Sequence, residues 1–155
     1  MNPAGQGAPK IRVLFVCIGN SCRSQMAEAF ARAYGDDVVT AASAGLSPAI
    51  SVASDTIRAM AERDLNVRDH FPKSIRQLGR AQFDIAVNLS GMPLPENVAP
   101  RVIEWEVEDP IGLSYEDHCT VRDQIERLAM NLVLELRRDR SGPRLRGQGS
   151  RFSQP

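Results

Sequence analysis

Residues 11–34 read IRVLFVCIGNSCRSQMAEAFARAY, and this stretch predicts a strand, a tight loop and a helix in succession. Residues 11–16 are almost wholly apolar and rich in β-branched side chains, as in strands that are buried on both faces. The loop that follows contains a glycine and an asparagine, both of which tolerate positive φ. From residue 22 to residue 34, apolar side chains recur at three- and four-residue spacing, which is typical of a helix with one buried face.

The rest of the chain continues this alternation of strands and helices. We expect further strands at 38–42, 83–89 and 101–107, and further helices at 51–63 and 117–138. Alternation of this kind predicts an α/β fold in which a parallel sheet is covered by helices on both sides. The expected organisation is a flexible N-terminal segment (1–9), one α/β domain (10–138) and a basic, disordered C-terminal tail (139–155).

Composition excludes several classes of protein. The 155 residues fit one domain, and the 19 basic side chains balance the 19 acidic ones, so no net charge favours nucleic acid or a membrane surface. No apolar run approaches the ~20 residues of a membrane span, and residues 1–9 do not resemble a secretory signal. The three cysteines are too few for a disulfide scaffold, and we therefore expect a protein of the reducing cytoplasm.

Cys17 and Arg23 lie six positions apart, between the first expected strand and the first expected helix. Ligands bind at the carboxyl edge of the sheet in open α/β folds, where the free N–H groups of the loop and of the helix's first turn converge. Such a nest suits tetrahedral anions such as phosphate or arsenate. The same positive field favours the thiolate form of Cys17, which is a nucleophile, and the planar guanidinium of Arg23 can hold two anion oxygens.

Simpler interpretations of the loop are less favoured. A cysteine after an apolar strand is by itself usually a small buried side chain, and it indicates chemistry only together with the Gly-Asn and Arg-Ser pairs that follow. Zinc is disfavoured because Cys17 and Cys22 lack a second ligand pair at zinc spacing. A nucleotide-binding loop is disfavoured because the loop has no Gly-Lys-Ser/Thr ending. We expect neither a metal nor a cofactor.

The motif VCIGNSCRSQMAEA at residues 16–29 resembles the signature of the low-molecular-weight protein tyrosine phosphatase superfamily, which includes the thioredoxin-coupled arsenate reductases. Ser43-Ala44-Gly45, Phe83-Asp84 and Asp109-Pro110 are further similarities. The resemblance covers about residues 10–138. It implies a single three-layer α/β domain with a four-stranded parallel sheet flanked by helices, and a phosphate-binding loop between the first strand and the first helix.

The resemblance also implies roles for individual residues. Cys17 would be the nucleophile, Arg23 the oxyanion clamp, and Asp109 the general acid and later the general base. The expected substrate-binding loop consists of Ile18, Gly19, Asn20, Ser21, Cys22 and Ser24, supported by Ser43. The role of Asp109 agrees with the chemistry, because the leaving oxygen needs a proton and the phosphocysteine then needs an activated water. One carboxyl group opposite the nucleophile can serve both steps.

Two activities of this superfamily share the first half of the chemistry. Water resolves a phosphocysteine, whereas a second thiol must reduce an arsenocysteine. Trp105 and residues 21–28 resemble the reductases, and Ile111-Gly112 stands where the phosphatases usually carry aromatic residues. In contrast, Ser90 stands where the reductases have their first relay cysteine, so an internal three-thiol relay is missing.

The leading hypothesis from the sequence is a phosphatase that hydrolyses phosphotyrosine-type proteins or aryl phosphates through a phosphocysteine. The alternative is an arsenate reductase that uses an external thiol, such as thioredoxin, glutaredoxin or mycothiol. A third class, an oxyanion-binding module without turnover, would not need Cys17 and Asp109. Cys22 is open to two interpretations, a protective disulfide with Cys17 or packing at the helix start. Cys119 is expected to pack near the start of the last helix.

Overall fold

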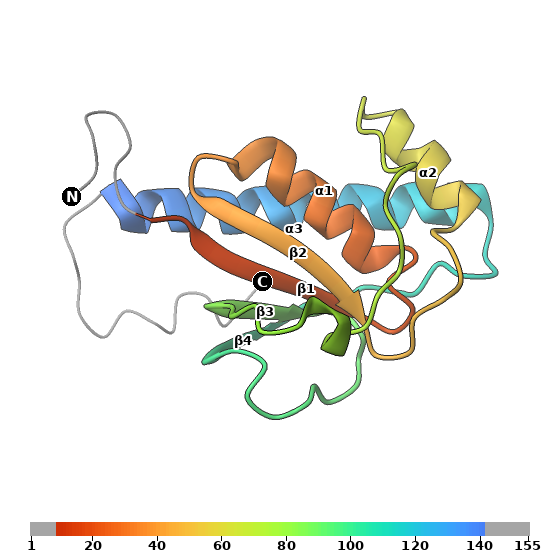
Figure 1. The fold of residues 1–155 in the computed structure, drawn as a ribbon. Coiled ribbons are helices and arrows are strands. Elements are labelled where there is room, and N and C mark those ends of the chain that lie inside the picture. The colour runs from red at the N-terminus through yellow and green to blue at the C-terminus, as the bar shows by residue number, and fades with distance from the viewer. Residues whose placement is uncertain (1–8, 142–155) are drawn as a thin grey trace.

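Four parallel strands form the central sheet (Figure 1). The computed structural model describes residues 9–141. The strands are β1 (Ile11–Cys17), β2 (Val39–Gly45), β3 (Ile85–Asn88) and β4 (Arg101–Glu104). They lie in the order β2-β1-β3-β4, and every neighbouring pair is parallel, which confirms the predicted sheet. Because β1 is an inner strand, the loop that follows it opens at the middle of the carboxyl edge.

Helices α1 (Arg23–Gly35), α2 (Ser54–Ala61) and α3 (Tyr115–Ser141) gather on one side of the sheet (Figure 1). Val13, Phe15 and Cys17 of β1 face this side and belong to the larger apolar core. Leu14 and Val16 face the other side, where a smaller core is covered by loops and the short 3₁₀ helix η1 (Arg76–Leu78). Both faces of β1 are therefore buried, as its apolar sequence predicts.

Gly35 sets how closely α1 and α3 approach each other. A Cβ atom built on this glycine would lie 2.6 Å from Cγ2 of Val133 in α3. Gly35 is the last residue of α1, and its lack of a side chain permits the close crossing of the two helices. Helix α1 packs against β1, β2 and α3, and both helices contribute to the larger apolar core.

Helix α3 is longer than the expected 117–138, since it runs from Tyr115 to Ser141. Its start is fixed by Ser114 and Asp117, whose side chains and backbone N–H groups bond reciprocally at 3.1 and 3.3 Å, as in a capping box. Near its end, Arg137 donates to Tyr34 O at 2.9 Å and pairs with Asp37 at 2.7 Å, which anchors the last turns. Residues 139–141 therefore belong to the helix and not to the expected tail; the rest of that tail and the N-terminal segment up to residue 8 lie outside the described residues. None of the helices within residues 9–141 has the length and apolar character needed to cross a membrane.

Candidate active site

The loop between β1 and α1 closes over the thiol of Cys17. Asn20, with φ of 52°, makes the turn that aims backbone N–H groups inward. Gly19 does not adopt the positive φ that a glycine tolerates. Gly45 of β2, in contrast, lies so close to the loop that a side chain at this position would clash with it. A Cβ on Gly45 would lie 2.8 Å from Ile18 O and 2.9 Å from Asn20 N. The sequence noted Gly45 only as part of a motif; in the structure it makes room for the loop.

Two donors converge on the sulfur of Cys17, which is almost completely buried. The backbone N–H of Asn20 donates to Sγ at 3.2 Å, and Ser24 Oγ lies 2.9 Å from Sγ. Ser24 Oγ already accepts a hydrogen bond from Asn20 Nδ2 at 2.7 Å, so its own hydrogen is free to point at the sulfur. The sulfur is thus placed to accept two hydrogen bonds.

The side-chain amide of Asn20 links the loop to β2 and α1. Its Nδ2 also donates to Ser43 Oγ at 3.0 Å, and Ser43 in turn donates to Glu28 Oε1 at 2.5 Å. Glu28 is held by Arg32 at 2.6 Å. Ser43 thus accepts from Asn20 and donates to Glu28, and hydrogen bonds connect Glu28, Ser43, Asn20 and Ser24 with the thiol.

Arg23, the first residue of α1, has a buried side chain. Its Nη1 donates to Leu89 O at 2.5 Å and to Val107 O at 3.0 Å, which joins the segments that follow β3 and β4. Its Nε is buried and has no hydrogen-bond partner within residues 9–141. A buried donor of this kind requires an acceptor, and an anion oxygen beside Nε and Nη2 would supply one in the two-pronged geometry that guanidinium groups favour.

Asp109 reaches the same guanidinium from the opposite side. Its Oδ2 lies 3.4 Å from Nη2 of Arg23, and its Oδ1 accepts a hydrogen bond from Ile111 N at 3.1 Å. The side chain is 44% exposed, so protons can be exchanged with water. The structure therefore brings the three expected catalytic residues, Cys17, Arg23 and Asp109, to one edge of the sheet.

Comparison with known proteins assigns the family. The model of the low molecular weight phosphotyrosine protein phosphatases matches residues 12–142. The chain belongs to this family.

Relatives within the superfamily are named mainly as arsenate reductases. A glutaredoxin arsenate reductase of a Synechocystis species is 34% identical, over 81% of this chain and 98% of its own length. An arsenate reductase solved in a phosphate-binding state has a TM-score of 0.75 and 32% identity, and covers 81% of this chain and 98% of its own. The low molecular weight protein tyrosine phosphatase of T. tengcongensis has a TM-score of 0.71 and 26% identity, with coverages of 82% and 100%. The comparisons thus favour the alternative hypothesis over the phosphatase that the sequence placed first.

Ser90 takes part in the hydrogen bonds of the segment that follows β3. Its hydroxyl donates to Asn88 Oδ1 at 2.6 Å and accepts a hydrogen bond from Met92 N at 3.0 Å. It therefore shapes the turn that follows β3. Cys119 lies half-buried near the start of α3, as expected. Among residues 9–141, no group of three or more His, Cys, Asp and Glu side chains is placed to hold a metal ion.

Cys22 differs from Cys17 although both lie in the loop. It is buried, and this burial raises the pKa of its thiol to about 11, with the nearby charge of Asp109 acting in the same direction. A thiol with such a pKa is protonated at neutral pH and reacts slowly. Of the two interpretations of Cys22, the structure favours packing at the helix start.

We predict that an alkylating agent distinguishes the two loop cysteines. At neutral pH, iodoacetamide should modify Cys17 at least about tenfold faster than Cys22, because only a thiolate attacks the reagent. Peptide mapping by mass spectrometry after timed exposure measures both rates. The unfolded chain is the control, in which the two rates should become equal. Fast modification of Cys22 in the folded protein would contradict its assignment as a buried, protonated thiol.

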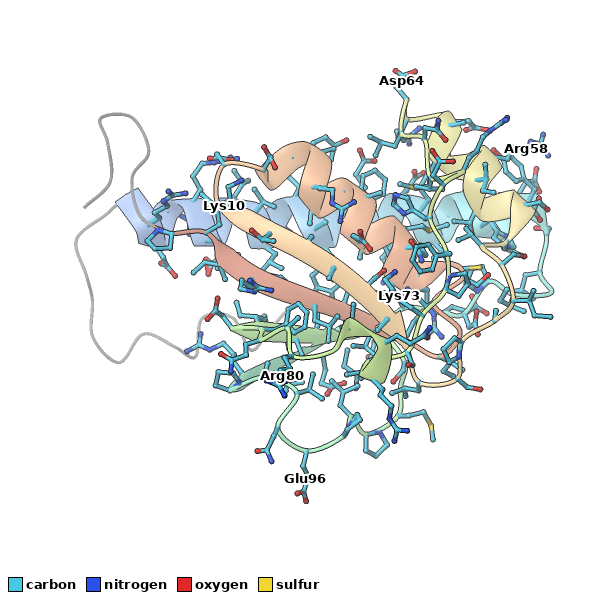
Figure 2. All side chains as sticks on the ribbon, viewed as in Figure 1. Lys10, Arg58, Asp64, Lys73, Arg80 and Glu96 are labelled. Carbon is cyan, nitrogen blue, oxygen red and sulfur yellow. The ribbon has the colours of Figure 1, made fainter. Side chains whose placement is uncertain are left out.

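A second group of side chains braces the loop from outside. Gln25 donates to Asn20 O and to Phe71 O, each at 3.2 Å, and its Oε1 lies 2.8 Å from His70 Nδ1. Lys73, at the carboxyl edge of the sheet, donates its backbone N–H to Asn20 Oδ1 at 3.0 Å (Figure 2). No role for His70 or Lys73 was predicted from the sequence, because both come from a loop about 50 residues beyond Asn20 and no local pattern indicates the contact.

His70 makes stability depend on pH. Burial lowers the pKa of its imidazole, the charge of Glu28 opposes this, and the charges of Arg32 and Lys73 lower it further. Below the ordinary value of 6.5, the unfolded chain binds a proton that the folded protein binds less readily. We therefore predict that His70 contributes less to the free energy of unfolding as the pH falls from 6.5 towards the folded-state pKa. Urea unfolding of the protein and of the His70→Gln variant across this pH range measures this contribution. If the contribution of His70 to the free energy of unfolding grew as the pH fell, the prediction would be wrong.

Proposed function

We propose that the protein reduces arsenate to arsenite and that an external thiol supplies the electrons. The observation that carries this proposal is the combination of a thiol inside an anion-binding loop with relatives, at 32% and 34% identity over nearly their full length, that are named arsenate reductases. Arsenate has the shape and charge of phosphate, and so it suits the same nest of N–H groups and the unpartnered Nε of Arg23.

The requirement for an external thiol follows from the other cysteines. Cys22 is protonated and buried, Ser90 stands in place of a relay cysteine, and Cys119 lies on α3. No second reactive thiol lies beside Cys17 among the residues that the structure describes. We therefore propose a small or protein thiol of the reducing cytoplasm as the electron donor.

The proposed reaction has three steps. The thiolate of Cys17 attacks arsenic, an S–As bond forms, and an arsenate oxygen leaves as water after taking a proton from Asp109. An external thiolate then attacks Sγ of Cys17, the S–As bond breaks, and its electron pair stays on arsenic, which leaves as arsenite. A second external thiolate attacks the mixed disulfide and restores the Cys17 thiolate. Each arsenate reduced thus yields one arsenite and one disulfide of the external thiol.

The test is arsenite production with glutathione, mycothiol, thioredoxin or glutaredoxin supplied separately. We expect arsenite with at least one of these donors, in a ratio of one disulfide per arsenite. If none of them yields arsenite while the protein hydrolyses an aryl phosphate, the reductase proposal is wrong.

A phosphatase acting on phosphoproteins or aryl phosphates is the second candidate, and the position of Asp109 favours it. Its partly exposed carboxyl group lies beside the guanidinium that would hold the transferred group, as a general acid requires. The full cycle of a phosphatase needs this residue twice, first as an acid and then as a base.

For this candidate, we predict that Asp109→Asn slows aryl phosphate hydrolysis by about 10²–10⁴-fold, the usual size of an acid–base contribution. Asp64→Asn, at an exposed position near the end of α2, is the matched control and should leave the rate unchanged (Figure 2). An equal rate for Asp109→Asn and the unmodified protein would make Asp109 a structural residue.

A further inference from the structure

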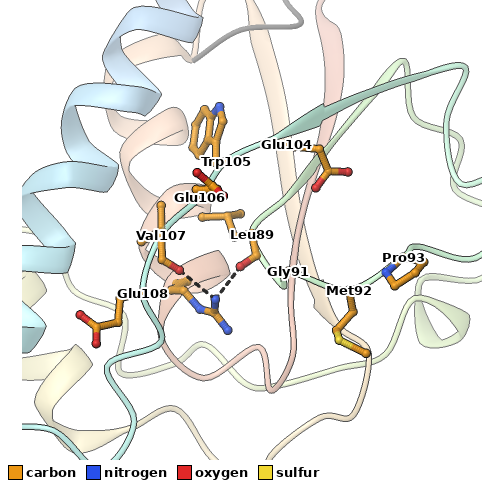
Figure 3. A pocket seen from close by; sticks show the side chains of 10 residues that line it. Leu89, Gly91, Met92, Pro93, Glu104, Trp105, Glu106, Val107 and Glu108 are labelled. Atoms are coloured by element: carbon orange, nitrogen blue, oxygen red, sulfur yellow. Dashed lines mark hydrogen bonds between the residues drawn. The ribbon is translucent and has the colours of Figure 1, made fainter.

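A broad pocket with an acidic wall lies beside Arg23 (Figure 3). One side is formed by residues 89–93, which follow β3, and the other by residues 104–108, at the end of β4 and beyond it. The pocket shares Arg23 with the anion-binding loop, so a molecule bound in it would lie next to the group that the loop holds.

The acidic wall arises from an alternation of acidic and apolar residues along the chain. Residues 104–108 read Glu-Trp-Glu-Val-Glu; Trp105 and Val107 are buried in the core, whereas the three glutamates are exposed. Extended chain directs successive side chains to opposite sides, so the glutamates share the outer side. Because the two apolar side chains are buried in the core, the three glutamates line the pocket.

Two of these carboxylates carry uncompensated charge. Glu104 accepts a hydrogen bond from Asn88 Nδ2 at 3.3 Å. Neither Glu106 nor Glu108 has a hydrogen-bond or ion-pair partner for its carboxylate within residues 9–141. The nearest cation of the pocket, Arg23, is itself paired with Asp109, and a bound oxyanion would neutralise it further.

The pocket is therefore unsuited to an anion, although it adjoins an anion site. The buried Nε of Arg23 has no hydrogen-bond partner within residues 9–141, so a ligand oxygen can occupy this junction. The oxyanion occupies the side of Arg23 that faces the anion-binding loop. The side that faces the acidic pocket remains open to the external thiol. Trp105, Leu89 and Met92 add apolar surface to the pocket.

We infer that this pocket admits the external thiol and selects a cationic or neutral thiol over an anionic one, an inference that rests on the proposed arsenate reduction. The thiol enters beside Arg23, and its thiolate attacks Sγ of Cys17 while the S–As electron pair passes to arsenic. A carboxylate on the body of the thiol is repelled by Glu106 and Glu108, whereas an ammonium group is attracted. Glutathione, with its excess of carboxylates, is disfavoured as the donor.

The experiment compares cysteamine, 2-mercaptoethanol and 3-mercaptopropionate as donors for arsenite production. Each rate constant is divided by that of the same thiol with an aromatic disulfide in free solution, which removes differences in intrinsic reactivity. At low ionic strength, we expect cysteamine to exceed 3-mercaptopropionate by about tenfold, a preference that salt should weaken. In the double variant Glu106→Gln/Glu108→Gln, the normalised rates of the three thiols should converge. Glu96→Gln, on the loop between β3 and β4 but outside the pocket, should keep the full preference (Figure 2).

A second assay omits arsenate. The mixed disulfide of Cys17 with 2-mercaptoethanol is prepared in a Cys119→Ser background, and its cleavage by cysteamine and by 3-mercaptopropionate is followed by mass spectrometry. A thiolate that attacks Cys17 Sγ releases the mercaptoethanol thiolate and stays on the protein, whereas attack on the outer sulfur releases the Cys17 thiolate and a small disulfide. The exchanged adduct has its own mass, so its rate of formation reports access to Sγ. We expect the same preference for the cationic thiol.

The outcomes separate the two proposals. If arsenite forms at equal normalised rates with all three thiols, or if the double variant keeps the preference, the charge-selective pocket is wrong and the reductase proposal stands. If no thiol yields arsenite, the reductase proposal fails, and the mixed-disulfide assay decides the pocket by itself. Equal cleavage rates there would overturn it.

Discussion

Replacing Cys17 with serine is expected to lower the rate of arsenite production by at least about 10⁴-fold, the size of effect seen when an enzyme loses its nucleophile. A serine hydroxyl is not ionised by the two donors that Asn20 N and Ser24 Oγ supply, and it cannot form the disulfide through which the electrons pass. Initial rates of arsenite release with an effective donor thiol measure the loss, while phosphate binding, followed by calorimetry, should persist.

Cys22→Ser is the matched control for this variant. It changes the same type of side chain in the same loop, but at a buried thiol whose pKa is raised to about 11. We expect it to keep most of the activity. If Cys17→Ser retained more than a few per cent of the rate, or if the two variants lost activity equally, Cys17 would not be the nucleophile.

Arg23→Lys is expected to lower kcat/KM by about 10²–10³-fold, as loss of a key oxyanion donor does. Lysine keeps the charge but lacks the planar fork, so the bonds to Leu89 O and Val107 O and the two-pronged hold on the anion are lost together. The free energy of unfolding should also fall by about 2–4 kcal/mol, because two buried carbonyl groups lose a charged donor.

Steady-state kinetics, phosphate affinity and urea unfolding measure these effects. Arg58→Lys is the control, because Arg58 is exposed on α2 and lies over the ring of Tyr115, away from the loop (Figure 2). A variant Arg23→Lys that loses stability but keeps its affinity for phosphate would mean that Arg23 only joins β3 to β4.

The first strand, the loop and the first helix could be predicted from the sequence because their signals are local. The apolar run of β1 fixes its burial on both faces, and the contacts among Cys17, Asn20 and Ser24 lie within a single turn of chain. The ends of α3 were less predictable. The capping pair Ser114 and Asp117 is visible in the sequence, but the anchoring of the last turns depends on contacts about 100 residues away.

The rest of the site could not be predicted because its partners come from distant segments. The carbonyl groups that hold Arg23 lie 66 and 84 positions away, and no pattern around Arg23 indicates them. The same is true of His70 and Lys73, and of the close approach of Gly45 to the loop. The order of the two hypotheses could not be decided from the loop either, because Cys17 forms the covalent adduct in both reactions and the loop does not show whether water or a thiol resolves it.

The most direct measurement of the proposed chemistry is the mass of the protein after a single turnover with arsenate and a limiting amount of 2-mercaptoethanol. We expect one thiol attached through a disulfide, located at Cys17 by peptide mapping, with one arsenite released for each adduct. Arsenite that accumulates while Cys17 stays unmodified and Cys119 carries the thiol would contradict it.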